Sequence, residues 1–445
     1  MKKTVQKNKM HIAIIGGGIA GLAAASELAE QGIKATLFEA GPHFGGRARS
    51  VAIEFNSQTF QVDNGQHILL GAYQETLGLL AKVGVDEKTA FTRLPLALNM
   101  LSGHNKQGFK LNCDNFLPHP FNQLVGFLGC QGLGFIERIS TILFMARLKR
   151  ASYRLTEDEP LNNFLLKNGQ SHHTINVLWE PLCLAALNTP IEHASSKVFL
   201  NVMGDAFRHK KTDSDFLIPK LDLSQILSTP ITRYLQEKEV NLFSNKRIRS
   251  IKESEHGFNV STRLETHEFS HVIIATPAKV LKELTVDLPK LDFITSQTAK
   301  YEDQPIYTIY LQYPRNITLA QPMLGMVDST SQWVFDRGQL CGQHGLIAVV
   351  ISAKGSHQKL TQDMLALKVA QELHHVIPHL PKPLWHKVIA EKRATISCTV
   401  NLPRPANLTP YQHLYLAGDY TYADYPATIE GAVRSGLACA HLILK

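Results

Sequence analysis

The sequence lacks a hydrophobic run long enough to cross a membrane. No stretch among its 445 residues approaches the ~18 consecutive apolar residues that a spanning helix needs. The basic start MKKTVQKNKM runs directly into HIAIIGGG, without a separate apolar core or a small-residue cleavage site, so we predict no secretory signal. Both absences favour a cytoplasmic protein.

Cysteine is also scarce. The six cysteines include no C-x-x-C pair. Their spacing therefore predicts free thiols, and it indicates neither a zinc site nor a dithiol redox centre. No metal site of another kind is predicted.

A nucleic-acid-binding motif is missing as well. The net charge is +8, and a basic surface attracts either nucleic acid or an anionic membrane. Because no block of Lys and Arg with interleaved aromatic residues is present, nucleic acid is not a predicted partner. Peripheral contact with the inner face of the cytoplasmic membrane is compatible with the charge.

The composition is otherwise that of an ordinary globular protein. Hydrophobic residues make up 44% of the chain and charged residues 19%, so substantial cores can form. The length exceeds that of one ordinary core, and two domains are the default expectation.

A glycine-rich turn between two strands is the strongest motif. Residues 11–15 (HIAII) are predicted to form a strand, Gly16-x-Gly18-x-x-Gly21 opens a helix, and residues 33–40 (IKATLFEA) form the next strand. Gly16 permits a tight turn, Gly18 lets the backbone approach a pyrophosphate, and Gly21 lets helix and strand pack closely. The βαβ unit therefore predicts a dinucleotide site at the helix N-terminus, where Ala20 also lies.

The end of the second strand adds to this site. Glu39 would accept hydrogen bonds from a ribose. The segment that follows, AGPHFGGRARS (40–50), resembles the second FAD signature of the FAD-dependent amine oxidase superfamily. The resemblance implies that FAD is the cofactor, that Ala40 and Gly46 lie against it, and that Arg47 offers several N–H donors to its phosphates.

Two later segments match the same superfamily. LAGD (416–419) ends a predicted strand, and PATIEGA (426–432) opens the last predicted helix. The resemblance implies an acid on the ribityl chain and free helix N–H groups at the flavin N1–C2=O edge, where negative charge develops on reduction. It also implies a backbone contact to adenine in KRIRSI. The residues concerned are Gly418, Asp419, Thr428, Ile429 and Ile248.

Two stretches carry a closer resemblance. The stretches are DNGQHILLGAY (63–73) and LWEPLCLAALNTP (178–190). Together with the PATIEGA helix start, they resemble the squalene-associated, desaturase-like family of hydroxysqualene dehydroxylases. The resemblance to this family covers nearly the whole chain. Tyr420 departs from the Trp that this family usually has there.

The resemblance implies an α/β fold of the amine oxidase and phytoene desaturase type. This fold has a discontinuous Rossmann-like FAD-binding domain and an inserted, mixed α+β substrate domain. The predicted FAD domain is 8–75, 230–290 and 408–445, and the predicted substrate domain is 76–229 and 291–407.

The implied reaction is a reduction of a lipophilic C30 isoprenoid. Hydroxysqualene would lose its allylic hydroxyl with help from an acid and accept a hydride from reduced FAD, giving squalene for hopanoid synthesis. A carotenoid or phytoene desaturase and an amine oxidase stay open as alternatives, as does a non-catalytic flavin-binding partner. No second glycine fingerprint follows a strand, so the sequence indicates neither the electron donor nor the oligomeric state.

The candidate catalytic residues are His67, Gln66 and Glu180. His67 and Gln66 follow Gly65, a predicted cofactor residue, in the segment that the superfamily places beside the flavin ring. His67 is the first candidate for the acid, because histidine has a suitable ordinary pKa, and Gln66 would hold the flavin or the hydroxyl. A lone histidine is more often structural, and Glu180 is a candidate only if it is desolvated rather than paired. The predicted substrate-pocket residues are Trp179, Tyr420, Tyr422 and Asp424.

A predicted helix over 133–150 (LGFIERISTILFMARLKR) suggests a route from the bilayer. It combines an apolar face with a basic C-terminal end, as interfacial helices do. A helix packed on the substrate domain explains the same pattern. The predicted apolar face is Leu133, Phe135, Ile136, Ile139, Ile142, Leu143 and Leu148.

Overall fold

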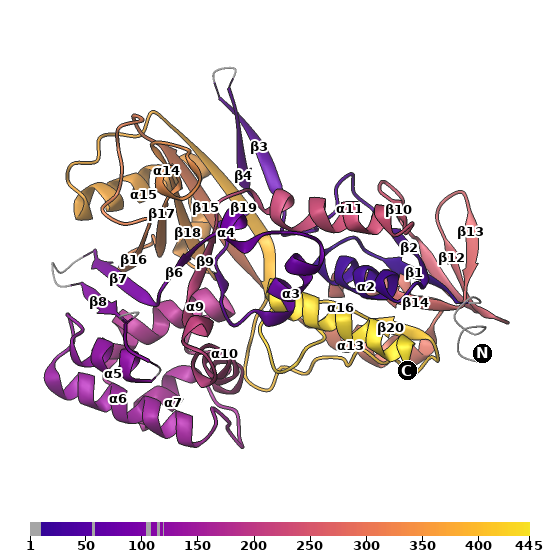
Figure 1. The fold of residues 1–445 in the computed structure, drawn as a ribbon, viewed down its shortest axis with the longest axis horizontal. Coiled ribbons are helices and arrows are strands. Elements are labelled where there is room, and N and C mark those ends of the chain that lie inside the picture. Colours follow the sequence, from indigo (N-terminus) through magenta and orange to yellow (C-terminus); the bar gives the residue numbers. More distant parts are fainter. Residues whose placement is uncertain (1–9, 56–57, 104–107, 114–115, 119) are drawn as a thin grey trace.

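The structure, a computed structural model, describes residues 10–445 except 56–57, 104–107, 114–115 and 119. Two large sheets organise the chain, one parallel and one mixed, and helices pack against both (Figure 1). This arrangement confirms the predicted α/β fold of the amine oxidase type.

The first sheet has five strands, and all of its pairings are parallel. Because both faces of the sheet are covered, its central strands are largely buried along their length instead of alternating between buried and exposed residues. In order across the sheet they are β10 (Asn241–Phe243), β2 (Lys34–Phe38), β1 (His11–Ile15), β14 (His271–Ile274) and β20 (Leu414–Leu416). All five lie inside the segments predicted for the FAD domain, while the exact domain boundaries stay a prediction.

Two helices from opposite ends of the chain cover one face of this sheet. These helices, α2 (Ile19–Glu30) and α16 (Ile429–Leu444), lie side by side (Figure 1), and Gly436 brings α16 so close to Ala20 that a Cβ there would collide with the Ala20 carbonyl oxygen. The other face packs on a small antiparallel meander, which consists of β11 (Ser250–Ser254), β12 (Gly257–Ser261) and β13 (Thr266–Phe269).

The second sheet has seven strands and divides two cores. Alternate residues of one strand point to opposite sides: Ile347, Val349 and Ile351 pack with helix α15 (Gln362–Val376), whereas Ala348 and Val350 face the helical layer described next. In order the strands are β19 (Trp385–Ile396), β15 (Asp303–Gln312), β18 (Leu346–Ser352), β17 (Trp333–Asp336), β16 (Met323–Val327), β7 (Ala97–Ser102) and β8 (Phe109–Asn112).

A helical layer closes the inner side of the second sheet. Trp179 anchors it, because its ring is buried edge-on against Phe144 and Phe199 and its indole N–H donates to Gln170 Oε1 at 2.9 Å. The helices are α5 (Phe121–Leu128), α6 (Phe135–Arg150), α7 (Leu161–Lys167), α9 (Glu180–Leu187) and α10 (Ser196–Arg208).

Shorter elements connect the half of the protein built on the parallel sheet with the half built on the mixed sheet. The hairpin of β3 (Ser50–Phe55) and β4 (Gln58–Asp63) belongs in sequence to the predicted FAD segments, yet Ile53 and Val62 join the core of the second sheet. The remaining elements of the junction are β5 (Leu69–Leu70), α3 (Gln74–Lys82), β6 (Phe91–Leu94), β9 (Phe216–Pro219) and α11 (Thr229–Glu237).

The predicted helix over 133–150 is present as α6, but its apolar residues do not share one face. Leu133 and Leu148 are buried in the core, whereas Phe135 and Ile136 are 74% and 83% exposed. Periodicity alone did not show which apolar stripe faces inward. None of the helices in the described ranges combines the length and the apolarity needed to cross a bilayer, and the basic start of the chain, residues 1–9, lies outside those ranges.

Candidate functional site

A single cavity of about 700 Å³ extends from the β1–α2 turn to the inner sides of α5 and α6. Its first part is lined by backbone and polar groups of the parallel-sheet half. Its second part is lined by apolar side chains of the second sheet and the helical layer. The two parts meet at residues 64–68, which follow β4.

The glycine turn shapes the first part as the sequence predicted. Gly16 has φ +116°, and a Cβ there would collide with the Ala275 carbonyl oxygen, just as a Cβ on Gly21 would collide with the Gly16 oxygen. Gly18 differs, because no atom lies within 4 Å of the position of its missing Cβ. Gly18 is also the N-cap of α2 without a side-chain cap, so the first N–H groups of the helix face open space.

Glu39 holds the loops around this space. Its carboxylate accepts hydrogen bonds from the N–H groups of Gly17 (2.8 Å) and Gly41 (2.7 Å), and its carbonyl oxygen accepts from Lys246 N (2.9 Å). Each carboxylate oxygen retains a lone pair for a ribose hydroxyl. The same loop brings the largely buried Ile248 to the cavity wall, beside Ala40.

Positive charge lines the middle of the first part. Four cationic side chains contribute to the lining there: Arg47, Arg49, Lys246 and Arg247. Arg47 donates to Asp419 Oδ2 at 2.6 Å and to the Ala394 carbonyl at 2.5 Å, and the Asp419 carboxylate raises the pKa of the Arg47 guanidinium. Cationic side chains at the cavity wall suit a pyrophosphate.

The start of α16 closes this part of the cavity. Thr428 caps the helix by accepting from Gly431 N at 3.1 Å, and Ile429 lies at the wall. The fully buried carboxylate of Glu430 accepts from Thr76 N (2.9 Å) and from Arg434 Nε (2.9 Å). These bonds fix the helix start to α3, so its free N–H groups are held in place.

These residues fit a dinucleotide cofactor. The open space at Gly18 leaves room for a pyrophosphate between a helix N-terminus and the cationic side chains. The hydroxyl of Thr276 lies at the wall and has no hydrogen-bond partner within the described part of the chain. A buried polar atom of this kind is satisfied when a polar ligand binds.

Gln66 lies where the two parts of the cavity meet, and its orientation is determined by Arg337. The buried Arg337 donates from Nη1 to Gln66 Oε1 at 2.6 Å. An arginine can only donate, so the amide oxygen of Gln66 must face it. The amide NH2 of Gln66 is therefore turned away from Arg337. One of its N–H groups makes a long hydrogen bond to the His67 carbonyl oxygen (3.5 Å), which leaves the other as a donor.

Tyr310 and Asp63 lie close to the Arg337 side chain. The guanidinium lies 5.8 Å from the centroid of the Tyr310 ring, and Tyr310 donates its hydroxyl to the Asp63 carbonyl at 2.9 Å. Burial raises the pKa of Asp63 to about 6, and the positive charge of Arg337 opposes that rise. Asp63 also accepts from Leu223 N at 2.8 Å, which anchors the end of β4.

His67 is the second polar residue at this point. Its Nδ1 lies 2.6 Å from the carbonyl oxygen of Gly65, and a carbonyl can only accept, so Nδ1 carries the proton. In the neutral ring Nε2 is then an acceptor, and His67 has an Nε2–H to give only as the imidazolium. Burial lowers the pKa of His67 below its ordinary value of 6.5, and the charge of Arg47 acts in the same direction.

The second part of the cavity is apolar. Side chains of four helices (α5, α6, α9 and α10) and five strands (β7, β8, β9, β17 and β18) meet there with those of connecting segments, and none of its described lining residues carries a carboxylate. The three acids in the lining, Glu39, Glu391 and Asp419, belong to the polar part. The main apolar residues are Leu96, Leu98, Leu111, Phe127, Met145, Leu178, Trp179, Leu182, Phe199, Met203, Phe207, Phe216, Trp333, Phe335 and Val350.

Comparison with known proteins identifies the family. The model of the family described as flavin containing amine oxidoreductase matches residues 19–444. The chain belongs to this family. It is therefore a flavin-dependent oxidoreductase, and the predicted family and enzyme class are confirmed.

Relatives of known name match over the whole length. A hydroxysqualene dehydroxylase of Zymomonas mobilis subsp. mobilis is 27% identical over 97% of this chain and 98% of its own. The hydroxysqualene dehydroxylase of Rhodopseudomonas palustris is 26% identical, and the match covers 100% of this chain and 99% of that protein. A zeta-carotene desaturase of Synechocystis sp. is 21% identical over 98% and 97%.

Two solved structures of low sequence identity share the fold. A putative protoporphyrinogen oxidase from Exiguobacterium sp. has a TM-score of 0.69 at 16% identity, covering 98% of this chain and 99% of its own. The cyclohexylamine oxidase of Brevibacterium oxydans has a TM-score of 0.68 at 15% identity, covering 98% of each chain.

The structure brings most of the predicted flavin residues together. All predicted cofactor residues except Gly21, whose role is packing, line the cavity, and so do His67, Gln66, Trp179 and Tyr420. Tyr420 is buried, and its hydroxyl has no partner within the described ranges. The contacts of these residues with a bound flavin stay a prediction.

Three predicted residues lie outside the cavity wall. Glu180 does not line the cavity, although Trp179 and Leu182 do, and burial raises its pKa, with a smaller contribution from Glu192. Tyr422 lies against the guanidinium of Arg434 instead, 5.8 Å from ring centroid to Cζ. Asp424 is exposed. The helical register of α9 directs Glu180 away from the cavity, and the sharp turn after Tyr420 does the same for Tyr422 and Asp424.

Sequence reasoning missed Arg337, Lys246 and Arg247. Lys246 and Arg247 directly precede Ile248 in NKRIRSI. Because Ile248 was predicted from the resemblance to the superfamily, its neighbours in the sequence could have been predicted with it. Arg337 lies 271 residues from Gln66 in the chain, and no local pattern connects the two.

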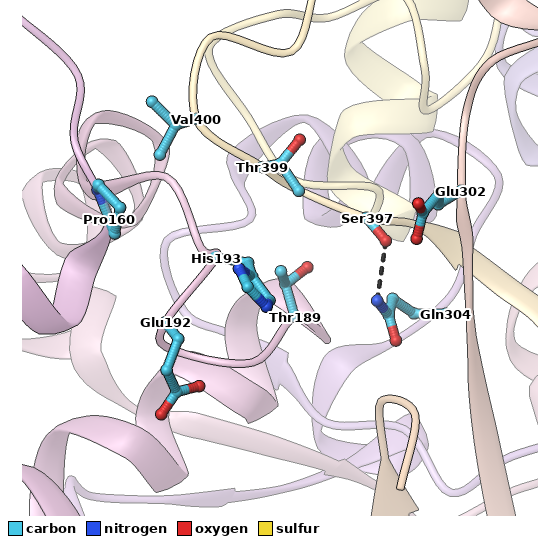
Figure 2. A pocket seen from close by; sticks show the side chains of 9 residues that line it. All are labelled: Pro160, Thr189, Glu192, His193, Glu302, Gln304, Ser397, Thr399 and Val400. Atoms are coloured by element: carbon cyan, nitrogen blue, oxygen red, sulfur yellow. Dashed lines mark hydrogen bonds between the residues drawn. The ribbon is translucent and has the colours of Figure 1, made fainter.

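A separate polar cleft of about 420 Å³ lies between the loop after α9 and the segment after β19 (Figure 2). Gln304 donates to Ser397 Oγ at 2.8 Å across it. Its acidic side chains are solvated, and Glu302 is paired with Lys354 at 3.0 Å. It is distinct from the flavin cavity and has no apolar lining that would suit an isoprenoid.

Proposed function

We propose that this flavin-dependent oxidoreductase removes the hydroxyl of hydroxysqualene to give squalene, with FAD as its flavin. The observation that carries the proposal is the continuous cavity, in which a dinucleotide cradle opens into an apolar space without a carboxylate. Full-length similarity to two hydroxysqualene dehydroxylases supports the choice of substrate. An amine substrate is disfavoured, because its cation would enter an apolar part that offers no counter-charge.

The reaction needs a hydride and a proton. The C–O bond of the allylic alcohol breaks, hydride adds to carbon, and the hydroxide leaves as water after taking a proton. Bound reduced FAD would supply the hydride and both electrons. The chain must therefore exclude water, hold the C30 chain and stabilise the departing hydroxide.

Gln66 is the donor that suits the departing hydroxide best. Because Arg337 holds the amide oxygen, the NH2 group is already oriented before substrate binds. His67 can supply a full proton only from the imidazolium, which its buried position disfavours. Gln66 would stabilise the leaving oxygen, while His67 or a water molecule would complete the proton transfer.

Gln66→Glu tests this role directly. A carboxylate keeps an acceptor for Arg337 but replaces the donor NH2 by a second acceptor. We expect the protein to fold and to retain its flavin, while turnover falls about 100-fold, the usual effect of removing one preorganised donor. Turnover and flavin absorbance are measured on the same preparation. Turnover within about threefold of the parent would exclude the donor role.

An anaerobic assay tests the reaction itself. The purified protein is supplied with hydroxysqualene and a chemical reductant, and squalene is measured by mass spectrometry. Release of the bound flavin and its chromatography decide between FAD and FMN. Oxidation of phytoene or zeta-carotene without any formation of squalene would overturn the proposal in favour of a desaturase, which the Synechocystis relative also represents.

A further inference from the structure

Helix α5 has an apolar stripe on its solvent side. Its exposed residues Phe121, Leu124, Val125 and Leu128 have the i, i+3, i+4, i+7 spacing that normally faces a core. Its buried residues instead include the polar Asn122 and a glycine, Gly126. This inverted arrangement is stable only if something apolar covers the stripe or if its exposure is functional.

Helix α6, which contacts α5, has further exposed apolar side chains. Phe135 and Ile136 are 74% and 83% exposed, and Leu143 is 56% exposed, two turns further along. Seven of the seventeen exposed large hydrophobic side chains in the described residues therefore lie on these two helices, which contact each other. We refer to this group as the α5–α6 face. It consists of Phe121, Leu124, Val125, Leu128, Phe135, Ile136 and Leu143.

The α5–α6 face covers the apolar end of the flavin cavity. Phe127, on the inner side of α5, and Met145, on the inner side of α6, both line that cavity. A single layer of helix therefore separates the cavity from the α5–α6 face. Figure 1 shows both helices at the edge of the molecule farthest from β12 and β13.

The charge around the α5–α6 face is positive. Between residues 116 and 154 the sequence has five Lys and Arg residues and one acidic residue, Glu137, a net charge of +4. Glu137 is turned to the protein, where it accepts from Gly134 N at 2.8 Å and from Ser171 Oγ. Arg147 and Arg150 are exposed in the last turn of α6, after the apolar residues. Apolar side chains followed by cations match the acyl and headgroup layers of an anionic membrane.

We propose that the α5–α6 face docks on a bilayer that contains anionic phospholipid, so that only one layer of helix separates the apolar end of the cavity from the acyl chains. The docking itself is inferred only from the exposed apolar side chains of the α5–α6 face and the charge around them. Entry of the isoprenoid at this point rests on the function proposed above, because a C30 hydrocarbon resides in the bilayer and not in water. The helices lie on the membrane and do not cross it.

Vesicle sedimentation tests the docking surface. The flavin-loaded full-length protein is mixed with phosphatidylcholine vesicles with and without phosphatidylglycerol. We expect binding to the anionic vesicles, weakened by high salt. The double variant Phe135→Ser/Ile136→Ser is expected to bind at least about tenfold more weakly, because two large apolar side chains no longer enter the acyl region. Arg147→Gln/Arg150→Gln is expected to lose most of the preference for phosphatidylglycerol.

A matched control is available on the opposite half of the protein. Leu264 and Phe293 are 86% and 80% exposed, so Leu264→Ser/Phe293→Ser removes similar exposed area. This variant should bind vesicles like the parent. Equal loss in both double variants, or no loss in Phe135→Ser/Ile136→Ser, would refute the proposal. Self-association of the parent that disappears in that variant, without any vesicle binding, would show that a second copy covers the face instead.

Activity measurements separate this inference from the proposed function. With substrate in detergent micelles, Phe135→Ser/Ile136→Ser should form squalene at the parent rate, and with substrate in anionic vesicles it should be slower. If the parent forms no squalene in either medium, the proposed reaction fails, while sedimentation still decides whether the α5–α6 face binds membranes.

Discussion

Gly18→Ala is expected to give a folded protein that binds FAD poorly. The added methyl group meets no protein atom within 4 Å, and the backbone at Gly18 has φ −72°, which alanine adopts readily. The methyl would instead occupy the space that the open helix N-terminus leaves for a pyrophosphate. Overpacking of this kind costs about 1–3 kcal/mol, which corresponds to a roughly 5- to 150-fold weaker binding of FAD. Titration of the apoprotein with FAD, followed by flavin fluorescence, measures the effect.

Gly78→Ala is the matched control. Gly78 also has no atom near its missing Cβ, but it lies in α3, outside the cavity lining. Alanine there should leave FAD binding unchanged and stabilise the fold slightly, since glycine is unfavourable inside a helix. Unaltered FAD affinity in Gly18→Ala, with the melting temperature of the apoprotein preserved, would contradict a pyrophosphate at this turn.

His67→Ala is expected to retain its flavin and to lose at least ~100-fold in turnover if His67 delivers the proton. The same role predicts a particular pH dependence. Only the imidazolium has an Nε2–H to give, and the pKa of His67 is lowered, so kcat/KM of the parent should fall as the pH rises through a value below 6.5. A pH profile of squalene formation from pH 5 to 8 tests this.

His67→Asn separates the chemical role from a structural one. Asparagine can donate to the Gly65 carbonyl, as Nδ1–H does, but it cannot deliver a proton. If His67 only positions the loop, His67→Asn should work normally and the pH profile should be flat. A flat profile combined with a large loss in Gln66→Glu would assign stabilisation of the departing hydroxide to Gln66 alone.

The cofactor half of the protein was predictable because its signals are local. The turn from Gly16 to Gly21, the acid Glu39 and the start of α16 each depend on a few neighbouring residues, and the geometry that they require allows few alternatives. A parallel sheet with both faces covered also leaves long apolar runs that are easily recognised as strands.

The substrate half was less predictable because its contacts are distant in sequence. The orientation of Gln66 depends on Arg337, on a different strand end, and the cavity wall combines alternate residues of β17 and β18 with helix faces far from them. For α6, the sequence contains apolar residues on more than one side. The side that faces inward is determined by its neighbours Phe164 and Trp179, which pack on Phe144.

The pairing of α2 with α16 has a consequence for how the protein matures. The polar part of the cavity begins at Gly16, directly after β1. It is closed by Thr428 and Ile429 at the start of α16, and α16 packs on α2 through Gly436. A ribosome that has made the first four strands of the parallel sheet, up to β14, has still not made β20 or the helix start that closes this part of the cavity. Loading of the flavin must therefore wait until nearly the whole chain has been synthesised, and nascent chains arrested before this helix should emerge colourless.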